Sequence, residues 1–211
     1  MPVLTYILAV LGAYLLGSIP TGFLVAKAKG IDIRTVGSKN MGATNVFRTL
    51  GTGPGVFVLL VDGLKGYAAA SWLCTLVLNF TASGEASFTV NVLAGIAAVL
   101  GHNYTCWLAF KGGKGIATTA GVYFALAPLA VSIALGCWIV LFVATRFVSV
   151  ASIAAAVALA VAVWATNRNL WLGAVTTLLC AMAIYKHKAN IQRLLAGTEN
   201  RISFKKEKPA A

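Results

Sequence analysis

Residues 115–145, GIATTAGVYFALAPLAVSIALGCWIVLFVAT, decide the fold of this chain because they contain no Lys, Arg, Asp or Glu and carry Pro128 near their middle. An uncharged run of this length crosses a bilayer as one helix, or as two short helices if the proline interrupts it. One helix predicts six membrane spans, with both chain ends on the same side. Two helices predict seven spans, with the ends on opposite sides.

Four further uncharged runs lie on either side of this stretch, at residues 2–26, 66–84, 86–110 and 169–185. Several reach the roughly 20 residues that a membrane-spanning helix needs. Of the 211 residues, 59% are hydrophobic, which is more than a soluble domain of this size can bury. The sequence therefore predicts an all-α, polytopic membrane protein. We expect spans at about 4–25, 56–80, 87–108, 148–165 and 170–185, beside those in 115–145, within a single domain 1–204. Residues 205–211 are expected to be a disordered basic tail.

The distribution of basic residues chooses between six and seven spans. With seven, 15 of the 17 Lys and Arg residues fall on one side, Arg168 falls on the other, and Lys65 lies inside a span. Cytoplasmic loops carry such an excess of positive charge. We therefore predict seven transmembrane helices, with the N-terminus outside, the C-terminus cytoplasmic, and two helices of about 15 residues around Pro128. The same rule accounts for the net charge of +12, so nucleic acid is not predicted as a partner.

The cysteines and the intramembrane charges favour structural roles. The four cysteines are far apart and form no CxxC pair, so neither a metal site nor a disulfide framework is predicted. They are expected to be buried as small hydrophobic residues. Asp62 and Lys65 stand three residues apart in a predicted span. Charges inside a membrane tend to pair, so we expect a structural ion pair.

The first polar cluster is Gly37-Ser-Lys-Asn-Met-Gly-Ala-Thr-Asn-Val-Phe-Arg48, which contains hydroxyls, amides and a guanidinium but no carboxylate. A helix beginning near Ala43 would direct its first N–H groups at an anion. It would also place Asn45 and Arg48 on one face. The alternative is an interfacial loop followed by an ordinary capped helix.

The second cluster joins Gly101-His102 to residues 110–118, FKGGKGIAT, with two lysines and three glycines in five positions. Lysines supply positive charge, and glycines let backbone N–H groups converge on a phosphate. Because Gly115 follows Lys114, the segment is not a Walker A loop. In the alternative interpretation, Lys111 and Lys114 anchor the chain at the membrane surface and His102 is merely packed.

The third cluster consists of Ser149 and Ser152 at the start of a span, together with residues 186–193, KHKANIQR. His187 and Asn190 are three residues apart, so a helix would bring them onto one face. Flanking lysines favour a neutral imidazole, which accepts protons or hydrogen bonds. The alternatives are a basic helix lying on lipid headgroups, and serines that satisfy backbone groups.

All three clusters fall on the predicted cytoplasmic side, so we expect one pocket that takes a phosphorylated substrate and an acyl chain. The sequence offers no Ser-His-Asp set, paired carboxylates or metal cluster for a hydrolase. A transporter or channel for a phosphorylated solute is the main alternative. A metal-dependent phosphatidyltransferase would need several aspartates, whereas the motifs contain Asp32 alone.

Four segments resemble the bacterial membrane glycerol-3-phosphate acyltransferases that use acyl phosphate, the PlsY type. They are GSIPTG at 17–22, the cluster at 37–48, residues 101–118, and His187…Asn190-Ile…Arg193-Leu-Leu…Gly197…Glu199…Arg201. The resemblance covers nearly the whole chain. One departure is Lys39, where the family has glycine. If this position takes a positive φ, lysine is strained there.

The resemblance implies transfer of an acyl group from acyl phosphate to the 1-hydroxyl of sn-glycerol 3-phosphate, which yields lysophosphatidate and phosphate. It implies a seven-span enzyme in the bacterial inner membrane with its active site facing the cytoplasm. Expected partners are acyl phosphate, glycerol 3-phosphate and membrane lipid; no cofactor or metal is expected, and we expect a monomer. The predicted catalytic residues are Ser38, Arg48, His187 and Asn190. The predicted substrate-binding residues are Asn40, Gly42, Thr44, Asn45, His102, Lys111, Gly112, Gly113, Lys114, Gly115, Ser149 and Ser152.

Overall fold

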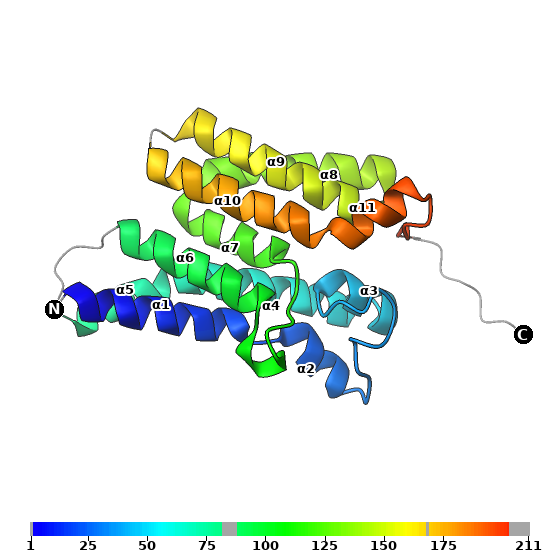
Figure 1. Cartoon of the computed structure of the whole chain (residues 1–211), viewed down its shortest axis with the longest axis horizontal. Helices are drawn as coiled ribbons and strands as arrows, with labels where there is room; N and C mark the ends of the chain where they lie inside the picture. Colours follow the sequence, from blue (N-terminus) through cyan, green and yellow to red (C-terminus); the bar gives the residue numbers. More distant parts are fainter. Residues whose placement is uncertain (1, 82–87, 168, 203–211) are drawn as a thin grey trace, which may run out of the picture. The chain divides into compact units, whose positions relative to one another are not determined.

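The structure is a computed structural model that describes residues 2–81, 88–167 and 169–202, and every regular element in these ranges is a helix (Figure 1). The chain forms two compact units, Met1–Leu129 and Ala130–Ala211, which are described separately below. The predicted all-α class is confirmed. The tail predicted at 205–211 lies outside the described residues.

The first unit is built from seven α-helices and one short 3₁₀ turn within its described part. These are α1 (Pro2–Ser18), α2 (Thr21–Lys27), α3 (Ala43–Leu50), α4 (Thr52–Ala70), α5 (Trp72–Phe80), α6 (Phe88–Asn103), η1 (Cys106–Leu108) and α7 (Ile116–Leu126). The second unit contains α8 (Pro128–Thr145), whose first two residues belong to the first unit, then α9 (Val148–Thr166), α10 (Leu170–Lys186) and α11 (Lys188–Leu195).

Pro128 divides residues 115–145 as predicted. Ala127 has φ −152° and ψ 71°, which ends α7, and Pro128 is the first residue of α8. A residue before proline avoids the helical region, and proline is well suited to a helix start. The predicted lengths were wrong, because α7 has 11 residues and α8 has 18. The lengths differ because Gly115 and Ala127 lie outside α7, whereas α8 begins at Pro128 itself and continues as far as Thr145.

Two predicted spans are each interrupted. Residues 4–25 do not form one helix, because α1 ends at Ser18 and α2 begins after Pro20, which has no N–H to donate. Residues 56–80 are divided at Ser71, whose φ of −128° and ψ of −77° separate α4 from α5. The break at Pro20 frees backbone carbonyls that must find partners elsewhere, as described below.

Four segments among the described residues are long and apolar enough to cross a membrane: Val3–Lys27, Thr52–Phe80, Pro128–Thr145 and Val148–Thr166. A fifth is obtained if α10 and α11, which meet at a bend of 53°, are taken together. The helices α6, α7 and α10 have 16, 11 and 17 residues, so they rise about 24, 17 and 26 Å at 1.5 Å per residue. The number of spans and their orientation therefore stay predictions.

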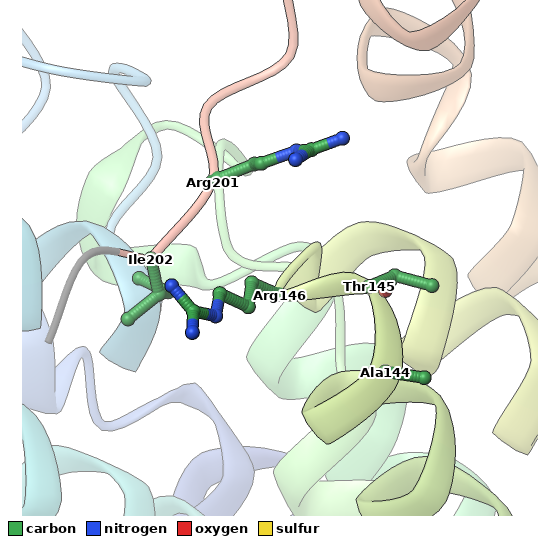
Figure 2. Close-up of a pocket in the computed structure, with 5 residues that line it drawn as sticks. All are labelled: Ala144, Thr145, Arg146, Arg201 and Ile202. Carbon is green, nitrogen blue, oxygen red and sulfur yellow. The ribbon is translucent and has the colours of Figure 1, made fainter.

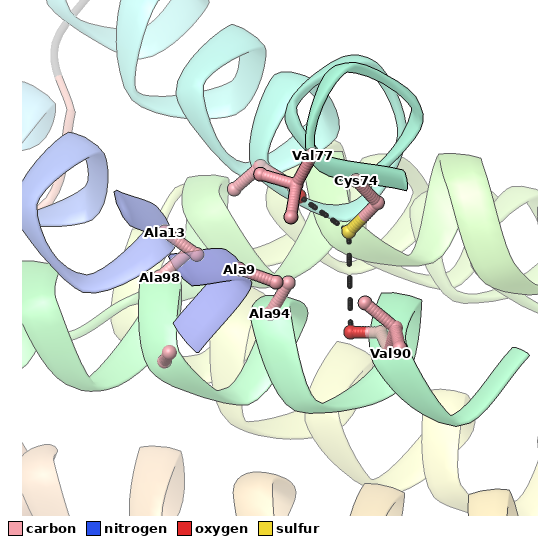
Figure 3. Packing of buried hydrophobic residues seen from close by; sticks show 9 residues of the cluster. Ala9, Ala13, Cys74, Val77, Val90, Ala94 and Ala98 are labelled. Atoms are coloured by element: carbon pink, nitrogen blue, oxygen red, sulfur yellow. Dashed lines mark hydrogen bonds between the residues drawn. The ribbon is translucent and has the colours of Figure 1, made fainter. Parts of the chain in front are cut away.

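Small residues bring the helices of the first unit into close contact. A Cβ on Gly17 of α1 would overlap the backbone of Ala98 on α6, and one on Gly66 of α4 would overlap the carbonyl of Thr118 on α7. Figure 3 shows the same pattern in the core, where alanines of α1 and α6 pack beside Cys74 of α5. Membrane helices lack a hydrophobic drive to associate, so they depend on such close packing.

In the second unit, tryptophans join neighbouring helices. The indole of Trp164 on α9 packs on Gly173 of α10 and donates to Thr177 Oγ1 at 3.0 Å. Trp138 on α8 donates to Ser152 Oγ on α9 at 3.1 Å. Each indole N–H thus has an acceptor on the neighbouring helix. The predicted structural role of the cysteines holds in part: Cys74 and Cys180 are buried, whereas Cys106 and Cys137 are half-buried.

Candidate functional site

The side chain of Asn45 organises the loop that precedes α3. Its Nδ2 group donates to the carbonyls of Ile33, Val36 and Asn40 at 3.1, 3.1 and 2.9 Å, and its Oδ1 accepts from the N–H of Ser38 at 2.9 Å. Asn45 is 1% exposed. A single amide thus satisfies four backbone groups of a polar loop. The observed contacts give Asn45 a positioning role, and its predicted contact with substrate stays a prediction.

The helix predicted near Ala43 is present as α3, with Asn45 and Arg48 both on it. Gly42 precedes the helix, and its N–H is held by Asn40 Oδ1 at 2.9 Å. The N-cap residue Gly42 has no side chain that could cap the first N–H groups of α3. This helix end therefore has donors that suit an anion. Ser38 and Asn40 precede this helix start, Thr44 lies in the first turn and Arg48 in the last turn; all four, which are predicted site residues, are half-buried.

Two positions in this loop have left-handed backbone. Gly37 has φ +57°, and a Cβ there would also overlap Asn45 Oδ1. Lys39 has φ +56°. This is the condition under which the sequence predicted strain, because a side chain is disfavoured in this region. Lys39 is exposed, so its ammonium group remains in contact with water.

The Lys-Gly loop, residues 110–115, rests directly on the end of α6. Gly113 donates its N–H to the carbonyl of His102 at 3.0 Å, and a Cβ on Gly113 would overlap the Nε2 atom of the imidazole. A Cβ on Gly112 would overlap the His102 carbonyl, and one on Gly115, whose φ is +79°, would press on Asn103. These glycines are therefore required by packing as well as by any phosphate. Sequence reasoning considered only the phosphate.

The loop leads into α7, whose first residue follows Gly115. Lys114 is half-buried and Lys111 is exposed. Leu108, just before the loop, packs against the buried cluster that includes Met41 and Val46. The segment before the Lys-Gly loop thus packs on the same buried cluster as the first polar segment.

The predicted ion pair between Asp62 and Lys65 is confirmed, with Lys65 Nζ 2.8 Å from Asp62 Oδ1 and both side chains buried. The Nδ1 atom of His102 lies 3.7 Å from the same carboxylate oxygen. His102 is therefore packed in the interior, as the alternative interpretation proposed, and it also supports the Lys-Gly loop.

In the second unit, Glu199 gathers the third cluster. Its Oε1 accepts from Ser149 at 2.9 Å and from Asn190 at 2.7 Å, while its Oε2 accepts from Arg193 Nε at 2.7 Å. Burial by itself raises the pKa of Glu199, but hydrogen bonds from Asn190, Ser149 and Arg193 outweigh burial and leave this pKa below its usual value. Sequence reasoning assigned Glu199 no role, although a lone carboxylate in a basic segment was a usable signal.

His187 is the N-cap residue of α11, the helix that contains Asn190, and their predicted common face stays a prediction. His187 stands at the junction of α10 and α11, and its carbonyl accepts the N–H of Asn190 at 2.8 Å. Its Nδ1 lies 2.8 Å from the carbonyl of Ala183. Because a carbonyl only accepts, Nδ1 carries the hydrogen. The Nε2 atom of a neutral ring is then the acceptor.

Near the end of α8, Ala144, Thr145, Arg146, Arg201 and Ile202 line a hollow (Figure 2). The two arginine side chains extend in opposite directions, and the Arg201 guanidinium stacks on Phe147 at 4.8 Å from the ring centroid. The two guanidinium groups therefore do not converge on one point in the hollow. Within the described ranges, no three His, Cys, Asp or Glu side chains are grouped so that they could hold a metal ion.

Comparison with known proteins agrees with this chemistry. A family model described as glycerol-3-phosphate acyltransferase matches residues 7–197. The chain is 51% identical to a glycerol-3-phosphate acyltransferase of Geobacter metallireducens, over 92% of this chain and 96% of the relative. It is 49% identical to one of Synechococcus sp. (strain JA-2-3B'a(2-13)), over 96% and 97%.

Solved structures are similar as well. The integral membrane glycerol 3-phosphate acyltransferase PlsY (YgiH), in its glycerol 3-phosphate form, superposes with a TM-score of 0.84 at 39% identity, over 94% of this chain and 96% of that one. The form of PlsY with lysophosphatidic acid gives a TM-score of 0.81 at 38% identity. The fold thus has a close counterpart among solved structures.

Proposed function

This chain belongs to the glycerol-3-phosphate acyltransferase family, and we propose that it uses acyl phosphate as the donor. It is an integral membrane acyltransferase of phospholipid biosynthesis. In the proposed reaction, the 1-hydroxyl of sn-glycerol 3-phosphate attacks the acyl carbonyl, and the carbon–oxygen bond to phosphate breaks. The products are 1-acyl-glycerol 3-phosphate and inorganic phosphate, in the first step of phospholipid synthesis.

The proposal rests on two helix N-termini in the first unit whose backbone N–H groups suit an anion. The N-termini of α3 and α7 follow Gly42 and Gly115; Lys114 directly precedes Gly115, whereas Arg48 lies in the last turn of α3. Backbone N–H groups at a helix start and a nearby cation together favour a phosphate. In the proposal, Arg48, Lys114 and the 112–115 backbone bind phosphate. Ser38 and Thr44 orient substrate oxygens.

The second unit is proposed to contribute His187 and Asn190, which position glycerol phosphate, with help from Ser149 or Ser152. The Nε2 acceptor of neutral His187 suits a hydroxyl donor, and Glu199 holds Asn190 and Ser149 in place. The active site is proposed to face the cytoplasm of a bacterial inner membrane, because almost all basic residues lie on that predicted side.

The proton of the attacking hydroxyl is proposed to pass to a substrate phosphate oxygen. Acyl phosphate has a good leaving group, so positioning and charge stabilisation supply much of the acceleration. His187→Gln tests this step through the dependence of rate on pH. A loss above about 10⁴-fold, beyond the usual range of general-base catalysis, with substrate affinity unchanged would instead assign the base to His187.

The donor is tested with purified protein in vesicles, given glycerol 3-phosphate and either acyl phosphate or acyl-CoA. We expect lysophosphatidate and phosphate to form from acyl phosphate, without added metal and with chelator present. Arg48→Gln should abolish turnover, whereas Lys27→Gln, a basic residue at the end of α2, should not. Product from acyl-CoA alone would overturn the proposed donor.

A further inference from the structure

The strongest feature that the proposed site does not use is a buried charged network beneath the Lys-Gly loop. Asp62 and Lys65 lie on α4 with side chains only 4% and 3% exposed. Thr21 Oγ1 donates to Asp62 Oδ1 at 3.1 Å, and Lys65 Nζ donates to the carbonyl of Ile19 at 2.8 Å. Both contacts reach the break between α1 and α2, where Pro20 interrupts the helix. The ion pair therefore ties α4 to this break.

The same break is tied to the C-terminal end of α6. The hydroxyl of Thr105 donates to the carbonyl of Ser18 at 2.5 Å, and Ser18 Oγ donates to the carbonyl of Gly101 at 3.3 Å. His102, next in the chain, places its Nδ1 atom 3.7 Å from Asp62 Oδ1. This distance is too long for a good hydrogen bond, but the two side chains are direct neighbours.

His102 also contacts the Lys-Gly loop, so it connects the buried ion pair to that loop. Its carbonyl accepts the N–H of Gly113, and Gly113 lies so close to the imidazole that no Cβ would fit. A rotation or shift of His102 must therefore move the backbone at Gly113. Lys114 and the start of α7 follow immediately.

A buried ion pair adds little to the free energy of unfolding. Removing two charges from water costs several kcal/mol per ion, and apolar residues of similar size are often equally stabilising. Ionisable residues are also rare inside a membrane, because a charge there is costly. The pair instead fixes the orientation of the Asp62 carboxylate, which Thr21 and His102 face.

We propose that the Asp62–Lys65 pair is a positioning element for glycerol 3-phosphate, acting through His102 on the Lys-Gly loop. This inference rests on the proposed role of that loop in binding phosphate. It predicts that the pair controls the affinity for glycerol 3-phosphate more than it controls turnover.

The test is the double variant Asp62→Asn with Lys65→Met, which removes both charges together and leaves no unpaired ion buried. We expect a folded protein whose KM for glycerol 3-phosphate rises tenfold or more, with kcat within about threefold of wild type. Thr5→Val is the control: Thr5 Oγ1 donates to Thr81 Oγ1 at 2.8 Å in the same unit. It lies about 20 Å along α1 from Ser18 at 1.5 Å per residue. Its KM should not change.

A coupling measurement shows whether the effect passes through His102. Gly113→Ala presses on the imidazole directly, so it should raise the same KM. Combined with the double variant, it should add much less than the product of the separate effects, because both disturb one contact. Multiplicative effects, or an unchanged KM in the folded double variant, would overturn the inference. If the double variant does not fold, Thr21→Val decides: a rise of about threefold in KM supports the inference, and no rise overturns it.

Binding of glycerol 3-phosphate measured by calorimetry, without any acyl donor, separates this inference from the proposed function. If wild-type protein does not bind the ligand, the role of the loop is wrong. If wild type and the double variant bind it equally well, only the positioning inference is wrong.

Discussion

Two polar segments of this protein are each organised by one buried side chain, and the two side chains differ in charge. In the first unit, the amide of Asn45 holds the loop before α3 through four backbone groups. In the second, the carboxylate of Glu199 holds Ser149, Asn190 and Arg193. An amide both donates and accepts, so it suits a loop of mixed backbone groups. A carboxylate only accepts, so it suits a cluster of side-chain donors.

Because the organising side chains differ in charge, the two segments depend on different interactions. The Asn45 loop relies on neutral hydrogen bonds between parts of one short stretch of chain. The Glu199 cluster joins α9 to α11 and to the segment after α11, and it requires an ionised carboxylate. The second segment should therefore be the more sensitive to substitution and the only one of the two whose organising side chain responds to acid.

The largest expected effect is that of Glu199→Ala. It leaves buried donors on Ser149 and Asn190 without their acceptor and removes the partner of Arg193. We expect the free energy of unfolding to fall by about 2–4 kcal/mol, with most activity lost. Thermal unfolding in detergent and acyl transfer measure this. Asp32→Asn is the matched control, because Asp32 and Arg34 also meet at 2.7 Å but on the exposed surface, and there we expect no measurable change.

A smaller loss is expected for Asn45→Ala. The loop loses its amide, but several of its half-buried backbone groups regain water. We expect about 1–3 kcal/mol less stability and a marked fall in activity, because Ser38 loses the contact that holds its N–H. Asn45→Asp retains the acceptor for Ser38 and loses the donors. A wild-type melting temperature for Asn45→Ala would contradict the organising role.

The response to pH separates the two segments most directly. The pKa of Glu199 is lowered in the folded protein, so in mildly acidic solution the folded state binds fewer protons than the unfolded state. Its contribution to stability is thus fully present above the ordinary glutamate pKa and is lost as the pH falls through the lower folded value. Wild type and Asn45→Ala should both lose stability on acidification. Glu199→Gln should lose clearly less. Parallel curves for wild type and Glu199→Gln would show that Glu199 is not the responsive group.

The smallest expected effect is a gain. Lys39 occupies a left-handed backbone position, which glycine adopts without a steric penalty. Lys39→Gly should therefore raise the free energy of unfolding by about 0.5–1 kcal/mol. Lys29→Gly, at a turn outside the left-handed region, should lower it slightly. Equal changes in the free energy of unfolding for the two substitutions would contradict strain at Lys39.

Much of the local structure was predictable. The absence of charge over long runs predicted the apolar helices, Pro128 predicted the division between α7 and α8, and a helix was expected to begin near Ala43, where α3 begins. The spacing of Asp62 and Lys65 predicted their ion pair. Each of these depends on neighbours within a few residues, which a sequence displays directly.

What the sequence did not reveal came from interactions that sequence spacing does not display. Asn45 was expected to contact substrate, which stays a prediction, but its hydrogen bonds to carbonyls of residues 33–40 were not foreseen. The glycines at 112–115 were explained by phosphate alone, although the ring and backbone of His102 and Asn103 occupy the space beside them. Glu199 received no role because its partners lie up to 50 residues away.

The sequence by itself determined an all-α membrane protein and the membership of an acyltransferase family, because apolar run length and motif order are local properties of the chain. Only the tertiary structure decided which polar residues hold the site together. Asn45, His102 with Asp62 and Lys65, and Glu199 act through contacts between separate segments. The Lys-Gly loop shows the difference: its composition indicated a phosphate, while its position against His102 and Asn103 leaves no room for a Cβ at its three glycines.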